Sequence, residues 1–188
     1  MVNPVPEGTH TVTPHLVIKG AAKAIDFYAR AFGAQEHHRM AMPGGLIGHA
    51  ELQIGDSLVY LADASPQGAA RSPQTLKGSS VVIHLYVDDV DSMFRRAVGA
   101  GAKVLMPVTD MFWGDRFGQV QDPFGHVWSV ATHKEDVSPD EMARRMAAMP
   151  PPSPARKKSA RAPGKAKASA QPGRSRPASK VRGKARRK

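Results

Sequence analysis

In the first third of the chain, the spacing of hydrophobic positions changes from that of a strand to that of a helix and then back to that of strands. The β-branched run VTPHLVIKG, which begins at Val12, predicts a strand. The segment AAKAIDFYARAF then places four apolar residues at helical spacing, and Gly33 follows it as a helix end. Three short apolar segments come next, separated by glycine-containing turns that favour hairpins. These segments are residues 35–40, 47–54 and 58–62. The pattern therefore predicts the order β-α-β-β-β.

The same order recurs after a loop rich in Pro, Gly and Ser. SVVIHLYV predicts a strand, VDSMFRRAVGAGA a helix and KVLMPV a strand. MFWGDRFGQVQD leads to a third strand, and HVWSVAT predicts a fourth. His15 and His84 are 69 positions apart, and Gly33 and Gly101 are 68 apart, so landmarks recur at a nearly constant offset. An internal repeat of this kind determines the architecture. The predicted modules span residues 11–64 and 80–133.

The predicted fold class is α+β, with tandem βαβββ modules that form a U-shaped mixed sheet around a cavity. One module cannot cover both faces of its own sheet, so we expect two copies to pair and enclose a concave surface. An N-terminal extension, residues 1–10, precedes the modules. Ser138, Pro139 and Glu141 have the spacing of a capping box and predict a C-terminal helix over 138–149.

Charge is distributed very unevenly along the chain. Residues 1–149 hold thirteen Lys and Arg and sixteen Asp and Glu, a net charge of −3, whereas residues 150–188 hold fourteen Lys and Arg and no acidic residue. The C-terminal segment also has no aromatic residue, so it predicts a disordered tail rich in Lys, Arg, Pro and Ala. Such a tail would contact DNA or RNA through phosphates without sequence specificity. A solvated tail, or one that touches an anionic lipid surface, is the alternative.

Composition and motifs exclude several classes. No apolar run approaches the roughly 18 residues of a membrane-spanning helix, and the N-terminus has no secretory signal pattern, which favours the cytoplasm. Absence of cysteine removes disulfides, thiolate metal sites and thiol catalysis. The sequence carries no phosphate-binding loop, serine-nucleophile elbow or dinucleotide fingerprint. We therefore expect no nucleotide cofactor.

Four segments together carry a family resemblance. They are PHLVIKGAAKAIDFYARAFGA, IGHAELQIGDSLVYLAD, IHLYVDDVDSMFRRAVGAGA and WGDRFGQVQDPFGHVWSVATHKEDVSPDEM. With the doubled module order, they resemble the vicinal oxygen chelate superfamily, the group of glyoxalases, bleomycin resistance proteins and extradiol dioxygenases. Within it they are most similar to the PhnB-like branch. The resemblance covers about residues 10–148, and DPFGHVW is its most specific part.

The resemblance implies a metal site on the first and last strand of each module. Those positions map onto His15 and His84, onto Val59 (or Tyr60 if the alignment slips by one), and onto Ser129. Metal-dependent members usually carry Glu or another good ligand where this chain has Ser129. Because stable centres need three or more suitable protein donors, two interpretations stay open for the two histidines. They hold one divalent metal ion, or they only line a pocket.

His49 and Glu51 are candidates for catalysis. They are two positions apart on one predicted strand, which places them on the same face. Glu51 could also supply the carboxylate that Ser129 lacks.

Aromatic residues and one arginine near the last two strands are candidates for ligand binding. Arg116 could pair with a carboxylate or phosphate, or stack on an aromatic ligand. Alternatively, it pairs with Asp115 near the surface while Trp113 seals the rim of the cavity. The predicted ligand-binding residues are Tyr60, Trp113, Arg116, Phe117, Trp128 and Ser129. Asp122 and Gly125 predict a turn, with His126 exposed beside it or as a turn partner.

Two functions from different classes follow. The first is an enzyme that acts on a small molecule, of the glyoxalase-like lyase or isomerase type; extradiol oxygen chemistry is not expected without the carboxylate. The second is a binding protein that sequesters an aromatic or cationic compound, as bleomycin resistance proteins do. In either case we expect a homodimer, with the modules paired within one chain or by exchange between two.

Overall fold

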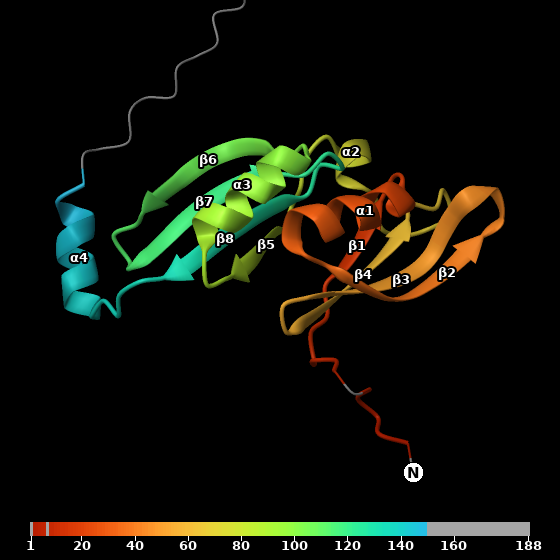
Figure 1. Ribbon diagram of the computed structural model, residues 1–188, viewed down its shortest axis with the longest axis horizontal. Coiled ribbons are helices and arrows are strands. Elements are labelled where there is room, and N and C mark those ends of the chain that lie inside the picture. The colour runs from red at the N-terminus through yellow and green to blue at the C-terminus, as the bar shows by residue number, and fades with distance from the viewer. Residues whose placement is uncertain (1, 7, 150–188) are drawn as a thin grey trace, which may run out of the picture. The chain divides into compact units, whose positions relative to one another are not determined.

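The computed structural model describes residues 2–6 and 8–149, which fold into two βαβββ modules (Figure 1). Module 1 forms a four-stranded sheet with the order β1-β4-β3-β2, in which β1 is parallel to β4 and the other pairs are antiparallel. Its elements are β1 (His15–Ile18), α1 (Ala21–Phe32), β2 (Gln35–Met42), the short helix η1 (Pro43–Gly45), β3 (Leu46–Ile54) and β4 (Ser57–Asp63).

Module 2 repeats this arrangement with the order β5-β8-β7-β6, and β5 is parallel to β8. Its elements are β5 (Val82–Tyr86), α3 (Val90–Ala100), β6 (Lys103–Asp110), β7 (Asp115–Gln121) and β8 (Val127–His133). A short helix, α2 (Pro73–Leu76), lies in the segment between the modules, and α4 (Pro139–Ala147) follows module 2. The predicted α+β class and the tandem βαβββ order are confirmed. Strand pairing among the described residues makes two four-stranded mixed sheets, one in each module.

Helix ends follow the residues that the sequence supplies for them. Gly33 has a φ of 71°, and its N–H donates to the Ala29 carbonyl at 3.1 Å, which ends α1 in the left-handed conformation that glycine tolerates. Ser138 accepts a hydrogen bond from the Glu141 N–H at 3.3 Å, as the capping-box spacing predicts. None of the described helices is long and apolar enough to cross a membrane. The predicted basic tail, residues 150–188, lies outside the described residues.

The helices cover one face of each sheet and pack against each other where the modules meet (Figure 1). Tyr28 and Phe32 of α1 contact the indole of Trp128 on β8, with ring centroids 5.3 and 4.6 Å apart. Phe27 lies against Phe124 of the turn before β8 at 6.1 Å. The aromatic core of module 1 therefore continues into module 2.

Asp122 joins the two modules by hydrogen bonds. It is 4% exposed, and its Oδ2 accepts from the Tyr28 hydroxyl at 2.8 Å and from the Trp128 indole N–H at 2.9 Å. Its Oδ1 accepts from the backbone N–H groups of Phe124 and His126, both at 2.9 Å. The predicted turn is present, since the Gly125 N–H also donates to the Asp122 carbonyl. The same side chain additionally links α1 to β8.

Candidate functional site

The face of the module 1 sheet that points away from α1 carries a cluster that we call the imidazole face: His15, His49, Glu51 and Tyr60. Strand alternation puts these side chains opposite the buried Leu16, Ala50, Leu52 and Leu61. The ring of His15 lies 6.1 Å from that of His49 and 6.4 Å from that of Tyr60. His49 Nε2 is 3.2 Å from a Glu51 carboxylate oxygen. The structure thus brings His49 and Glu51 together on one face with His15.

Strand register identifies which residue of β4 accompanies His15. His15 of β1 lies directly beside Tyr60 of β4, whereas Val59 is 4% exposed and belongs to the core under α1. Of the two positions left open by the sequence, Tyr60 is therefore the one on the open face. Burial, and next the neighbouring His49, lower the pKa of His15. A neutral imidazole at His15 is consequently favoured near pH 7.

Module 2 presents an equivalent open face with a different composition, which we call the aromatic face: His84, Tyr86 and Phe117. The ring of His84 lies 4.6 Å from that of Tyr86 and stacks on that of Phe117 at 5.9 Å. Trp113 meets Phe117 edge-on at 5.7 Å. Ser129 lies beside His84 in the strand register, is 2% exposed, and accepts a hydrogen bond from Gln119 Nε2 at 3.1 Å.

Asp115 organises the edge of the aromatic face. This carboxylate is 4% exposed, and its Oδ2 accepts from the Tyr86 hydroxyl at 3.0 Å and from the Trp113 indole N–H at 2.9 Å. Its Oδ1 lies 2.9 Å from His133 Nδ1. Burial alone would raise the pKa of Asp115, but the hydrogen bonds from His133, Tyr86 and Trp113 outweigh burial and lower it. The hydrogen bond to Asp115 raises the pKa of Tyr86 in turn.

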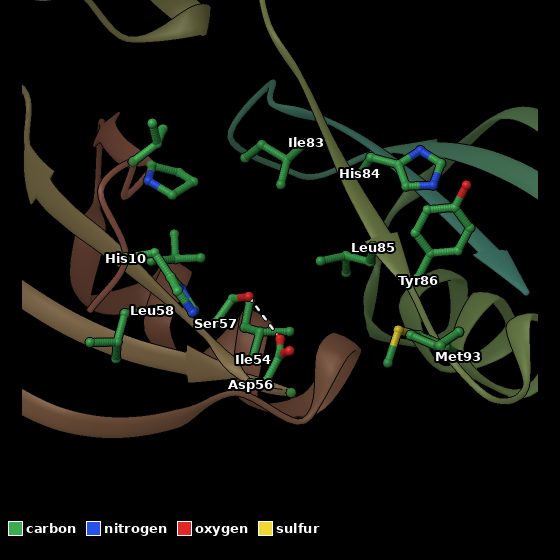
Figure 2. Close-up of a pocket in the computed structure, with 15 residues that line it drawn as sticks. His10, Ile54, Asp56, Ser57, Leu58, Ile83, His84, Leu85, Tyr86 and Met93 are labelled. Atoms are coloured by element: carbon green, nitrogen blue, oxygen red, sulfur yellow. Dashed lines mark hydrogen bonds between the residues drawn. The ribbon is translucent and has the colours of Figure 1, made fainter. Parts of the chain in front are cut away.

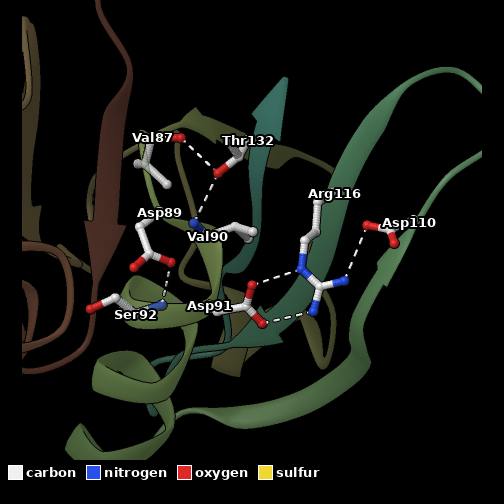
Figure 3. A network of polar contacts seen from close by, with 8 residues as sticks. All are labelled: Val87, Asp89, Val90, Asp91, Ser92, Asp110, Arg116 and Thr132. Carbon is white, nitrogen blue, oxygen red and sulfur yellow. Dashed lines mark hydrogen bonds and ion pairs between the residues drawn. The ribbon is translucent and has the colours of Figure 1, made fainter. Parts of the chain in front are cut away.

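Arg116 is occupied by partners within module 2 (Figure 3). Its Nε and Nη2 donate to the two carboxylate oxygens of Asp91 on α3 at 2.7 and 2.9 Å, and its Nη1 donates to Asp110 at 3.1 Å. These hydrogen bonds raise the pKa of the guanidinium. The sequence alternative paired Arg116 with Asp115, and the structure corrects the partner to Asp91 and Asp110. We therefore leave Arg116 out of the proposed site.

Trp128, another predicted ligand-binding residue, lies in the core. It is fully buried and donates its indole N–H to Asp122, on the side of β8 that faces the helices. Adjacent residues of a strand point to opposite faces, so Ser129 is the neighbour that faces away from the helices. Tyr86 and His133 are site residues that the sequence analysis missed. The alternation of HLYV, which puts Tyr86 on the same face as His84, was the available signal.

The two histidines that the internal repeat relates line different cavities. His84 and Tyr86 lie on one side of a cavity of about 540 Å³ between the modules, opposite Asp56, Ser57 and the N-terminal His10 (Figure 2). His15 lines a second cavity of about 330 Å³, under the segment that contains α2. Their ring neighbours also come from their own modules. The expected approach of His15 to His84 is not supported by any of these contacts.

Comparison with known proteins assigns the family. The model of the Glyoxalase/Bleomycin resistance protein/Dioxygenase superfamily matches residues 9–130. The chain belongs to this superfamily. Members of this vicinal oxygen chelate (VOC) fold bind or modify small molecules, and a role of that kind is what the fold supports here.

Individual relatives agree with this assignment. An uncharacterised protein of Mycobacterium tuberculosis, Rv0887c, is 46% identical over 138 residues, which cover 72% of this chain and 81% of the relative. The crystal structure of TioX from Micromonospora is 28% identical and has a TM-score of 0.54, covering 66% of this chain and 98% of TioX. A PhnB protein from Bacillus cereus, 16% identical, shares the fold with a TM-score of 0.52 over 65% of this chain and 99% of its own.

The donor set does not fit the divalent metal that the VOC superfamily implies. The positions on the first and last strands hold His15, Tyr60, His84 and Ser129, and neutral hydroxyls are weak ligands beside imidazole. The hydroxyl of Ser129 is also engaged by Gln119. Within residues 2–6 and 8–149, no group of three or more His, Asp or Glu side chains is arranged to hold a metal ion.

Proposed function

We propose that the protein binds a small aromatic cation between the imidazole face of one copy and the aromatic face of a second copy in a homodimer. One observation carries this proposal: the two modules present different, chemically specialised open faces that contact separate cavities. Each face is half of an enclosure, since the helices occupy only the opposite side of each sheet. Pairing by exchange between two chains would place His15 of one copy opposite His84 of its partner.

The composition of the faces supports an aromatic, cationic ligand. Phe117, Tyr86 and Trp113 offer ring surfaces that attract cations and planar groups. Glu51 adds a carboxylate on the opposing face, with 31% of its side chain exposed.

Exposed apolar side chains near both faces support the proposal that a second copy of the chain covers them. Val82 and Tyr86 of β5 are 50% and 65% exposed, and Met40 of β2 is 50% exposed. Contiguous exposed apolar surface commonly marks an association site. Burial of both open faces in a dimer would remove this surface from water.

A complementation experiment tests the exchange. The variants His15→Ala and His84→Ala would each weaken binding of 9-aminoacridine, a planar aromatic cation, measured by its fluorescence. Subunits of the two variants, unfolded and refolded together, would regain intact sites in mixed dimers, because one of the two sites then contains neither substitution. Binding that stays as weak in the mixture as in the separate variants would refute exchange. A monomer in light scattering would refute the dimer.

A second candidate function, proton transfer on a bound small molecule, is favoured by one specific contact. His49 lies 3.2 Å from Glu51 and 5.0 Å, ring to ring, from Tyr60. A carboxylate that orients an imidazole is a common arrangement for general acid and base catalysis. A glyoxalase-like lyase or isomerase would use His49 as the base. Loss of turnover with retained ligand affinity in His49→Gln would support this function, and loss of affinity alone would support sequestration.

For the basic segment 150–188 we propose non-specific contact with nucleic acid. Fourteen Lys and Arg in this segment would release counterions from DNA or RNA on binding, so affinity should fall steeply with salt. A chain that ends at Met149 should lose this binding. Full DNA affinity in the shortened chain would contradict the proposal.

A further inference from the structure

The smaller cavity between the modules contains a buried imidazole that the proposed function does not use. His126 forms part of the wall of the 330 Å³ cavity and is 9% exposed. Within the described part of the chain, its Nε2 is the one buried side-chain nitrogen or oxygen without a hydrogen-bond partner. Buried polar atoms are nearly always partnered, by protein, water or ligand. The sequence analysis expected His126 to be exposed or a turn partner, and its burial corrects the first alternative.

The position of His126 is set by the turn that precedes β8. Its backbone N–H donates to the buried Asp122 carboxylate at 2.9 Å, and the Asp122 N–H donates to its carbonyl at 2.9 Å. Gly125, with a φ of 95°, brings the turn so close to α2 that an added Cβ would lie 3.0 Å from the Pro73 Cβ. The backbone of His126 is therefore held by the same residue that joins the modules.

The opposite wall, α2, is also fixed, although it lies in a Pro-, Gly- and Ser-rich segment. Ser72 is fully buried and caps the helix by accepting from the Thr75 N–H. Gln74 donates from its side chain to the Pro123 carbonyl at 3.2 Å, 49 positions away. The helix is thus docked onto the turn that carries His126. The cavity is a built feature of the fold.

The lining combines apolar walls with the imidazoles of His15 and His126 and the polar side chains of Arg71, Ser79 and Ser80. Pro14, Val17, Leu76 and Ile83 provide apolar surface. Burial lowers the pKa of His126, and the nearby Asp122 and the Val17 carbonyl oppose it only in part. A neutral imidazole offers one N–H donor and one lone pair. With its N–H on Nδ1, the ring carries its lone pair on Nε2, which can then accept a hydrogen bond.

We propose that this cavity is a second binding site, for a small phenol or a similar one-ring aromatic alcohol that donates its hydroxyl to His126. Its volume lies at the lower end of the usual range for small-molecule pockets, roughly 300–1,000 Å³, and therefore suits one ring. The apolar walls hold the ring, and the hydroxyl supplies the partner that Nε2 lacks. The site does not depend on the dimer, because every wall comes from one chain.

The test compares 4-methylphenol with 4-methylanisole, which has the same ring and no hydroxyl proton. Calorimetry with the full chain should give an affinity for 4-methylphenol at least tenfold higher. Long-range ¹H–¹⁵N spectra should show the Nε2 resonance of His126 shift as the phenol saturates. Equal affinity for the two compounds would overturn the proposal.

Two variants test whether 4-methylphenol binds beside His126. His126→Phe should lower the affinity for 4-methylphenol about tenfold, whereas the matched change His37→Phe, at an exposed position on β2, should leave it unchanged. Unchanged affinity in His126→Phe would also overturn the proposal. If that variant does not fold, the spectrum of the wild-type protein decides, because an Nε2 resonance that does not move at saturation excludes the contact. Failure here would leave the 9-aminoacridine site unaffected, since His15 is the only residue that the two sites share.

Discussion

The two modules share one fold and differ in almost every side chain that could do chemistry. Module 1 presents His15, His49 and Glu51 on its open face, whereas module 2 presents rings that a buried Asp115 fixes at their edge. Both modules keep the strand order and the covering helix. The same strand order therefore supports two open faces of different chemistry. A cavity built from both faces then has two unlike walls, which one module alone could not supply.

The largest expected effect concerns the residue that joins the modules. Asp122→Ala would leave the Tyr28 hydroxyl and the Trp128 indole N–H buried without a partner. With a penalty of about 1–3 kcal/mol for each such group, we expect the free energy of unfolding to fall by about 3–5 kcal/mol in urea denaturation. Asp26→Ala, an exposed carboxylate on α1, is the control and should change it little. A loss of less than about 1 kcal/mol for Asp122→Ala would mean that the modules are held together by other contacts.

Substitution of two equivalent glycines allows the packing of the two modules to be compared. Gly48 on β3 and Gly118 on β7 are 70 positions apart, the offset of the repeat. An added Cβ at Gly118 would lie 2.8 Å from the ring of Phe94 in the core and 3.0 Å from Val108, which packs against that core, whereas at Gly48 it would meet the flexible ends of Met42 and Met40.

Gly118→Ala should therefore reduce the free energy of unfolding by about 1–3 kcal/mol through overpacking. Gly48→Ala should cost less than about 1 kcal/mol, because the methionine side chains can move aside. Thermal unfolding followed by circular dichroism measures both. Equal costs at the two positions would show that the Phe94 core relaxes as easily as the methionines.

Side-chain substitutions on the two open faces measure how much each face contributes to ligand binding. Phe117→Ala removes ring surface and should weaken 9-aminoacridine binding about tenfold, consistent with roughly 0.5–2 kcal/mol for an aromatic or cation–π contact. Glu51→Gln removes one partly exposed charge and should weaken it about threefold, in line with roughly 0.2–1 kcal/mol for an exposed ion pair. Fluorescence titration at two salt concentrations separates them, since only the Glu51 effect should shrink with salt. The reverse order would make the imidazole face the main binding wall.

The sequence predicts local features well, but it predicts less well which face of a sheet a side chain points to. Ser138 and Gly33 mark helix ends because capping depends on neighbours in sequence, and His49 and Glu51 share a face because strand alternation is strict. The side that Trp128 faces is not indicated locally, because HVWSVAT has apolar residues at both sets of alternating positions.

Contacts between distant residues were beyond local patterns. Arg116 donates a hydrogen bond to Asp91, 25 positions away in the sequence, and Asp122 accepts one from Tyr28, 94 positions away. Burial of His126 likewise depends on α2, a helix of four residues within a segment whose composition indicates a loop. Such contacts follow from how helices and sheets pack within and between the modules, which neither periodicity nor motif spacing encodes.

The smallest expected effect, dependence of stability on pH, has opposite signs in the two modules. The hydrogen bonds to Asp115 and then Asp136 raise the pKa of His133 in module 2. This contribution is fully present below the unfolded-state pKa and is lost as the pH rises through the higher folded-state value. Burial and His49 lower the pKa of His15 in module 1, so its protonation destabilises the fold as the pH falls below the unfolded-state value.

His133→Asn should therefore reduce stability at pH 5 more than at pH 8, and His15→Asn should reduce the loss that the wild-type protein suffers at pH 5. Urea midpoints at the two pH values, for both variants and the wild-type protein, measure the difference. Asp136→Asn provides the control for His133, because it removes the negative charge of one of the two carboxylates that raise the pKa of His133 and should give an intermediate result. If both histidine variants shift the midpoints in the same direction, the two modules do not differ in how they hold their histidines, and the electrostatic contrast between the faces fails.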